Sequence, residues 1–178
     1  MEEKNKIKAE IMDKAAVSRA LSRISHEIVE KNRGVKNIAI IGVRKRGDVL
    51  AERIAEKIKS IEKADVKAGA IDITFYRDDY DINTKAEVGS TDITFSLDGK
   101  DIILVDDVLF TGRTTRAAMD VLMEFGRPKT IQLAVLIDRG HRELPIQANY
   151  AGKNVPTGLN EKIVFDLEGK DNVLLAEK

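Results

Sequence analysis

The feature that most constrains the fold of this chain is an apolar run that leads directly into two adjacent carboxylates. Residues 102–105 read Ile-Ile-Leu-Val, and Asp106 and Asp107 follow without a break. A continuous apolar run of this kind is typical of a strand that is buried on both faces, as in a parallel sheet. The sequence Thr-Gly-Arg-Thr-Thr comes next, at residues 111–115, and we expect it to form a loop that opens a helix. This order predicts a strand–loop–helix unit of an α/β protein.

The polar residues of this unit indicate a ligand. Two acids at the exit of a strand can both turn into a crevice at the carboxyl end of a sheet. The loop at 111–115 supplies backbone N–H groups and three hydroxyls at a helix N-terminus, which favours an anion. Carboxylates can bind the hydroxyls of a sugar, and the neighbouring loop can bind a phosphate. Together they indicate a phosphorylated sugar as the ligand. An ordinary turn with exposed acids is the simpler alternative, but the apolar run, the acids and the loop agree on the functional interpretation.

Two commoner phosphate motifs are absent from the chain. A P-loop would need a glycine where Asp107 stands before Gly112, and no Gly-x-Gly-x-x-Gly occurs anywhere. The site, if it binds phosphate, therefore belongs to another class.

Composition narrows the class of protein further. The chain has 178 residues, a formal net charge of zero, two histidines and no cysteine. This length suits one domain over residues 1–178, and a neutral protein can bind nucleic acid only through a local patch. The lack of cysteine excludes disulfides and thiol catalysis, and with so few histidines we expect no dedicated metal site. The charged start of the chain and the lack of a long apolar run predict a cytoplasmic protein.

Helix and strand patterns alternate along the chain. Helices are predicted at 13–32, from Val49 onward and at 114–125, and buried strands at 37–43, 68–76, at the apolar run before the acids and at 131–137, with one or two short strands after Asp138. This alternation predicts a twisted, mainly parallel sheet with helices on both faces. The polar segment 77–91 is expected to be a long loop that closes over the site as a lid, with Lys85 as a candidate for a pyrophosphate contact.

Three strand exits are predicted to meet in one crevice, because the carboxyl ends of parallel strands share an edge of the sheet. They are residues 44–47, 106–115 and 138–142. The first reads Arg-Lys-Arg-Gly where a strand turns into a helix, and cations at a helix N-terminus suit a pyrophosphate. A solvated basic turn would explain this segment equally well if it stood alone. Its place one crossover before the acid pair favours the pyrophosphate.

The segment 102–115 resembles the phosphoribosyl pyrophosphate (PRPP) signature of the type I phosphoribosyltransferases. The resemblance implies their fold, with a small hood beside the sheet, and it makes Asp106 and Asp107 the catalytic residues, which bind the ribose hydroxyls. It implies that the 5′-phosphate is held by Thr111, Gly112, Arg113, Thr114 and Thr115. The leaving pyrophosphate would be held by Arg44, Lys45, Arg46 and Gly47, in a loop that often carries a cis peptide in this family. Mg²⁺ would be carried by PRPP, with few direct protein ligands.

Outside that signature the resemblance becomes more specific. The segments 76–79, 138–146 and 153–156 are similar to those of a group of bifunctional regulators within the family. Proteins of this group bind pyrimidine-operon messenger RNA when UMP or UTP is present and promote transcription termination (attenuation). They also make UMP and pyrophosphate from uracil and PRPP. The resemblance implies both activities here, and we expect uracil to sit against Ile137, Asp138, Arg139 and Gly140.

Basic residues on the first predicted helix indicate where RNA would bind. Arg19, Arg23 and His26 recur at helical spacing opposite the apolar residues, without a matching acid on the same line. Most charged helix faces are only solvated, and that alternative stays open. By resemblance, the RNA surface also includes Ser22, His141, Arg142 and Lys153. Phosphate contacts would make the affinity depend on salt, and we expect a homodimer or a higher homo-oligomer, which would double the patch.

Other functions stay open on the sequence alone. The protein could be a uracil or other type I phosphoribosyltransferase that acts only in salvage, without RNA, or a regulator whose enzymatic site only senses nucleotides. Phe110 stands where hypoxanthine-type relatives carry an aspartate that contacts the base, and phenylalanine cannot exchange a proton with a purine nitrogen. This argues against purine salvage, and the segment 141–145 argues against an orotate enzyme.

Overall fold

The computed structural model describes residues 6–78, 89–167 and 169–177. Its centre is a five-stranded sheet in the order β3-β2-β4-β5-β6, and each neighbouring pair is parallel. The strands are β2 (Ile38–Val43), β3 (Lys67–Ile71), β4 (Asp101–Leu109), β5 (Thr130–Asp138) and β6 (Tyr150–Asn154). The parallel sheet confirms the fold class predicted from the alternating pattern.

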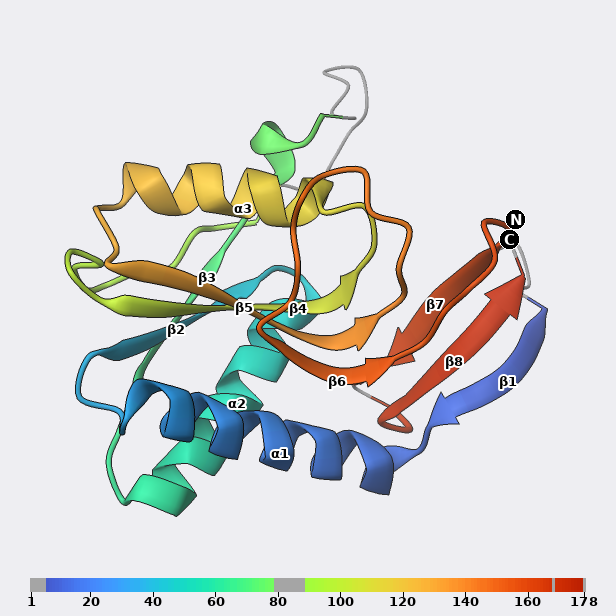
Figure 1. The fold of residues 1–178 in the computed structure, drawn as a ribbon, viewed down its shortest axis with the longest axis horizontal. Coiled ribbons are helices and arrows are strands. Elements are labelled where there is room, and N and C mark those ends of the chain that lie inside the picture. Colours follow the sequence, from blue (N-terminus) through green and yellow to red (C-terminus); the bar gives the residue numbers. More distant parts are fainter. Residues whose placement is uncertain (1–5, 79–88, 168, 178) are drawn as a thin grey trace.

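Helices cover both faces of this sheet. Helices α1 (Lys14–Asn32) and α2 (Arg46–Glu62) lie on one face, and α3 (Arg113–Glu124) lies on the other (Figure 1). The apolar run of β4 divides between the two faces: Ile103 and Val105 pack in the core with α1 and α2, whereas Ile102 and Leu104 pack in the core with α3. Each strand side chain points to the face opposite its neighbour's, so a strand covered on both faces needs apolar residues at every position.

The first helix ends where its sequence predicts. The Asp13 carboxylate accepts a hydrogen bond from the backbone N–H of Ala16 at 2.7 Å, which caps the N-terminus of α1. At the other end, Arg33 is left-handed with a φ of 55°, and Gly34 follows with a φ of 106°. Glycine adopts positive φ at little cost, so it is well suited to stop a helix here.

A second, smaller sheet forms the hood. Its three antiparallel strands lie in the order β1-β8-β7, with β1 (Ile7–Met12), β7 (Glu161–Asp166) and β8 (Asn172–Glu177). The hood stands beside the carboxyl end of the main sheet (Figure 1). The strand β1 was not predicted from the sequence, and three strands, β6, β7 and β8, lie after Asp138 where one or two were expected. The short strand β1 is held by pairing with β8, from the other end of the chain, which a local pattern does not reveal.

Two predicted boundaries were wrong. The strand predicted at 68–76 ends at Ile71, because the carboxylate of Asp72 accepts a hydrogen bond from the backbone N–H of Thr74 at 2.7 Å and starts a turn. A short 3₁₀ helix, η1 (Thr74–Tyr76), follows. The strand β4 continues to Leu109, so the acid pair lies inside the strand rather than at its exit.

The lid predicted at 77–91 falls mostly on residues 79–88, Lys85 among them, which lie outside the described residues. Among the helices that the structure describes, none combines the length and apolar character needed to cross a membrane.

Candidate active site

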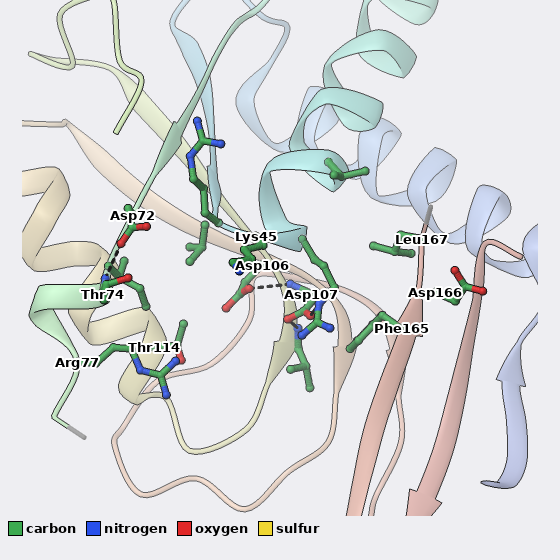
Figure 2. Close-up of a pocket in the computed structure, with 16 residues that line it drawn as sticks. Lys45, Asp72, Thr74, Arg77, Asp106, Asp107, Thr114, Phe165, Asp166 and Leu167 are labelled. Atoms are coloured by element: carbon green, nitrogen blue, oxygen red, sulfur yellow. Dashed lines mark hydrogen bonds and ion pairs between the residues drawn. The ribbon is translucent and has the colours of Figure 1, made fainter. Parts of the chain in front are cut away.

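A cavity of about 650 Å³ lies at the carboxyl ends of β2 and β4 (Figure 2). The loop between β2 and α2 lines one side of it, and the acid pair of β4 lines it as well. The hood closes a further side through Phe165, Asp166 and Leu167. Two of the three predicted strand exits therefore meet in one cavity, as the parallel sheet requires.

The acid pair is buried and hydrogen-bonded to its own backbone. Asp106 and Asp107 are 8% and 6% exposed. The carboxylate of Asp106 accepts the N–H of Asp107 at 2.8 Å, and that of Asp107 accepts the N–H of Val108 at 2.7 Å. Burial, together with the neighbouring charge of Asp107, raises the pKa of Asp106 well above its ordinary value. The ligand-free site thus disfavours two full negative charges, which makes it receptive to a cation or to a sugar ring that gains positive charge.

The Arg44–Gly47 loop brings cations to the same cavity. Its Arg44–Lys45 peptide bond is cis, in keeping with the family resemblance. Arg46 is ion-paired with Asp107, with 2.5 Å between Nε and Oδ2, and its guanidinium lies 5.3 Å from the centre of the Phe165 ring. Arg44 donates to the Ser90 carbonyl at 2.7 Å. The cations predicted to hold pyrophosphate are therefore gathered at the cavity, where protein groups hold both arginines in the absence of ligand.

Gly47 has a packing role in the first turn of α2. A Cβ at Gly47 would lie 2.5 Å from the carbonyl oxygen of Val105 and 3.1 Å from the Cα of Asp106. A side chain at this position would therefore force α2 away from β4. The glycine lets the first turn of α2 approach the acid pair directly, which places the N-terminus of this helix at the cavity.

The loop at 111–115 opens α3 and lines a neighbouring cavity of about 480 Å³. Gly112 precedes the first residue of the helix with a φ of 93°. The guanidinium of Arg113 donates to Glu143 and to Asp78, both at 2.6 Å. Because two carboxylates already neutralise Arg113, an anion here would depend on the hydroxyls and on the backbone N–H groups of the first helical turn, which have no partner within the helix.

The structure places the predicted uracil-contacting residues beside a different cavity. Ile137 is fully buried, and Asp138, Arg139 and Gly140 line a cavity of about 730 Å³ on the far side of β5 from β4, next to β6. Arg139 is 5% exposed and turns toward the hood, where it donates to the Thr157 hydroxyl at 2.9 Å and to the Glu161 carbonyl at 3.0 Å. This arginine therefore holds the hood against the main sheet.

The predicted RNA-binding residues come from α1, from β6 and from the loop between β5 and β6. Arg19 and His26 are exposed on α1, whereas Arg23 donates to the Gly152 carbonyl of β6 at 2.6 Å and pairs with Glu27 at 3.4 Å. The expectation that this stripe lacks a matching acid was therefore wrong, because Glu27 is one helical turn from Arg23. The arginine also joins α1 to β6, which brings the two elements onto one side of the molecule.

The remaining predicted RNA residues make contacts that shape their own loops. Lys153 donates to the Ile11 carbonyl at 3.0 Å, and the His141 ring is hydrogen-bonded to the Thr157 carbonyl at 2.5 Å. The guanidinium of Arg142 donates to the carbonyls of Ile146, Phe110 and Gly140 and to the Asp138 carboxylate. Arg142 is thus largely engaged inside its loop.

Sequence reasoning missed three sets of residues. Asp72, Ile73 and Thr74, just after β3, line the 650 Å³ cavity. Phe165, Asp166 and Leu167 line the 650 Å³ cavity from the hood, where β7 pairs with β8 and β8 pairs with β1 from the other end of the chain. Lys57 of α2 donates to the Ser22 hydroxyl at 3.0 Å, in a groove of about 530 Å³ between α1 and α2 that His26 also lines. The helical spacing of α2 could have shown that Lys57 lies off the apolar stripe, but not that it faces α1.

Comparison with known proteins agrees with this geometry. The family model described as a phosphoribosyl transferase domain matches residues 8–168. The hypoxanthine phosphoribosyltransferase of Trypanosoma cruzi superposes with a TM-score of 0.74 at 16% identity, over 99% of this chain and 94% of that one. A hypoxanthine-guanine phosphoribosyltransferase from Bacillus anthracis gives a TM-score of 0.70 at 23% identity, over 97% and 98%. These two likenesses show the fold alone; with the matching family model, fold and site define a type I phosphoribosyltransferase.

Curated relatives give a closer match. The bifunctional protein PyrR of Enterococcus faecalis is 52% identical over 92% of each chain. That of Pelotomaculum thermopropionicum is 53% identical over 96% of each chain. The chain belongs to the PyrR family of phosphoribosyltransferases.

Proposed function

We propose that this protein converts uracil and PRPP to UMP and pyrophosphate, and that it binds pyrimidine-operon messenger RNA in response to UMP or UTP to promote transcription termination. The observation that carries the enzymatic part is the buried Asp106–Asp107 pair, which lies between two loops suited to anions. The Arg44–Gly47 loop lines the same cavity as the acids, and Thr114 of the second loop lines it as well. A phosphate at each loop and a ribose at the acids matches the three parts of PRPP.

The catalytic contribution of these residues is positioning and charge stabilisation. When the bond to pyrophosphate breaks, the ribosyl ring gains positive charge. Asp106 and Asp107 hold the ring by its hydroxyls and stabilise that charge, while Arg44 and Arg46 stabilise the departing pyrophosphate. The N-terminal turn of α3 holds the 5′-phosphate, so that the reacting carbon stays in place while the base attacks.

Magnesium would enter with PRPP as part of the substrate. Among the residues that the structure describes, no group of three or more His, Cys, Asp or Glu is arranged to hold a metal ion. Mg²⁺ keeps several waters and commonly binds one or two carboxylates together with substrate phosphates. The buried pair Asp106 and Asp107 fits that mode, because its own unfavourable charge is relieved when a cation arrives.

Uracil is proposed as the base for two reasons. The relatives at 52–53% identity are PyrR proteins, and Phe110 stands where the hypoxanthine-type enzymes have an acid. Initial rates with uracil, hypoxanthine, guanine and orotate at one PRPP concentration test this choice. Uracil should be used fastest. A faster rate with a purine would return the assignment to another type I transferase.

The regulatory part is supported by the family and by the exposed basic groups of α1 beside β6. The relatives are named as bifunctional, which favours a regulator with enzymatic activity over an enzyme of salvage alone. A homodimer or a higher homo-oligomer would present the α1 surface twice. The test is a titration of the full protein with the leader RNA of its own pyrimidine operon, with and without UMP. Tighter binding with UMP supports the proposal, and no binding in either condition leaves only the enzyme.

A further inference from the structure

The loop at 109–113 and the segment 139–146 are joined at several consecutive positions. The carbonyl of Leu109 accepts the N–H of Arg139 at 3.0 Å. The carbonyl of Thr111 accepts the N–H groups of Glu143 and Leu144 at 2.9 and 3.1 Å. Between these backbone contacts, the carbonyl of Phe110 accepts a hydrogen bond from the guanidinium of Arg142 at 2.9 Å. The loop proposed to hold the 5′-phosphate is therefore bonded directly to the segment that carries His141 and Arg142.

The side chain of Phe110 makes the same connection through its ring. The guanidinium of Arg139 lies 3.9 Å from the ring centre, within the range of a cation–π contact. The ring of His141 meets it edge-on, with 5.9 Å between centres and 77° between planes. Both partners are then hydrogen-bonded to Thr157, Arg139 to its hydroxyl and His141 to its carbonyl. Phe110, Arg139, Thr157 and His141 thus form a closed circuit of contacts, and this circuit orients His141.

The phosphate loop and the 139–146 segment are also closely packed against each other. A Cβ at Gly112 would lie 3.3 Å from side-chain atoms of Ile146, so the two segments are in close contact there. The ion pair between Arg113 and Glu143 adds a further link at 2.6 Å. A displacement of the phosphate loop would therefore move the 139–146 segment with it, because closely packed groups transmit small shifts rather than absorb them.

We propose that Phe110 is a positioning residue that couples the nucleotide site to the RNA surface. This inference rests on the proposed function, since it assumes that UMP binds at the 111–115 loop and that His141 contacts RNA. A 5′-phosphate on that loop favours one arrangement of Phe110, and this arrangement orients His141 as RNA requires. Coupling of this kind is reciprocal, so RNA should raise the affinity for UMP by the same factor as UMP raises the affinity for RNA.

The test measures that factor in the full-length protein. The dissociation constant of the leader RNA is determined with and without saturating UMP for the wild type, Phe110→Leu and Phe110→Tyr. Leucine keeps apolar bulk but loses both ring contacts, whereas tyrosine keeps the ring. Phe125→Leu, at an exposed position just after α3, is the matched control.

The wild type and Phe125→Leu should show a typical allosteric factor of about 5- to 150-fold. In Phe110→Leu the factor should fall toward one while saturating UMP still binds, and Phe110→Tyr should restore it. An unchanged factor in Phe110→Leu would overturn the inference and leave the proposed function intact. A wild type that binds no RNA, or binds it equally with and without UMP, would instead overturn the regulatory function and the inference with it. Binding of labelled UMP and a thermal melt of each variant establish that it is folded and loaded.

Discussion

Arg46 and Asp107 form an ion pair in the 650 Å³ cavity, with 2.5 Å between Nε and Oδ2. Arg46 belongs to the loop proposed to hold pyrophosphate, and Asp107 belongs to the pair proposed to hold the ribose. The arginine is about half exposed and the aspartate is buried, so water already screens one partner. Bound substrate can therefore replace this ion pair with two new interactions. The pyrophosphate binds Arg46, and the ribose hydroxyls donate hydrogen bonds to Asp107. The ion pair keeps the pyrophosphate subsite next to the ribose subsite before the ligand binds.

Arg46→Gln should raise the KM for PRPP and weaken inhibition by pyrophosphate. Loss of a charge-assisted hydrogen bond costs about 1.5–3 kcal/mol, which corresponds to roughly ten- to hundredfold in affinity. Steady-state kinetics at varied PRPP measure this effect. Arg127→Gln, at an exposed position before β5, is the control and should leave the KM unchanged. An unaltered KM in Arg46→Gln would show that this arginine does not contact the pyrophosphate.

Asp106→Asn should raise the melting temperature of the ligand-free protein near neutral pH while it lowers turnover. Burial and the Asp107 charge raise the pKa of Asp106 above its value in the unfolded chain. The native state then holds its proton to higher pH than the unfolded state, so stability falls as pH rises from the ordinary aspartate range to the raised pKa. Asparagine carries no ionisable proton, so Asp106→Asn does not lose stability over this pH range.

The difference in melting temperature between Asp106→Asn and the wild type should depend on pH. Below the ordinary aspartate range, Asp106 is protonated in both states, and the melting temperatures of Asp106→Asn and the wild type should converge. Thermal melts across the pH range measure the convergence. Asp65→Asn, whose side chain is 81% exposed, should follow the wild type throughout. A lower melting temperature for Asp106→Asn at neutral pH would contradict the raised pKa.

Arg19→Ala should weaken binding of the leader RNA and flatten its salt dependence, since one phosphate contact is lost. Arg23→Ala should weaken RNA binding too, but it should also lower the melting temperature, because Arg23 is hydrogen-bonded to the Gly152 carbonyl of β6. Filter-binding titrations at two salt concentrations measure the first effect. Lys129→Ala removes an exposed charge just before β5 and should change neither quantity. Equal RNA affinity for Arg19→Ala and Lys129→Ala would mean that the α1 face is only solvated.

The main sheet and its acid pair could be predicted from the sequence because their signals are local. A strand covered on both faces needs an apolar run such as 102–105. Asp13 caps the start of the first helix with its side chain, and Gly34 follows its end with a positive φ. Each of these features depends on residues close in the chain. The resemblance to a known family then supplied the roles of the two anion-binding loops.

The hood and its contribution to the cavity could not be predicted in the same way. The strand β1 is short and mixed in polarity, and its pairing with β8 joins opposite ends of the chain. Phe165 reaches Arg46 only because that sheet forms. Arg139 shows the same dependence on distant contacts: it lies beside a strand exit, and its side chain is directed to the hood by Thr157 and Glu161. The local sequence predicts where the backbone of a residue lies in the sheet. Contacts with residues distant in the chain determine the direction of its side chain.

Conversion of labelled uracil by the wild type and by Asp107→Asn, with PRPP and Mg²⁺, tests the central claim most directly. The wild type should form UMP and pyrophosphate in equal amounts. Asp107→Asn should keep its fold but lose on the order of ten- to a thousandfold in rate, as is typical when one positioned charge of a catalytic site is removed. Asp120→Asn, an exposed acid on α3, should keep the wild-type rate. Wild-type turnover in Asp107→Asn, or no UMP from the wild type, would contradict the account.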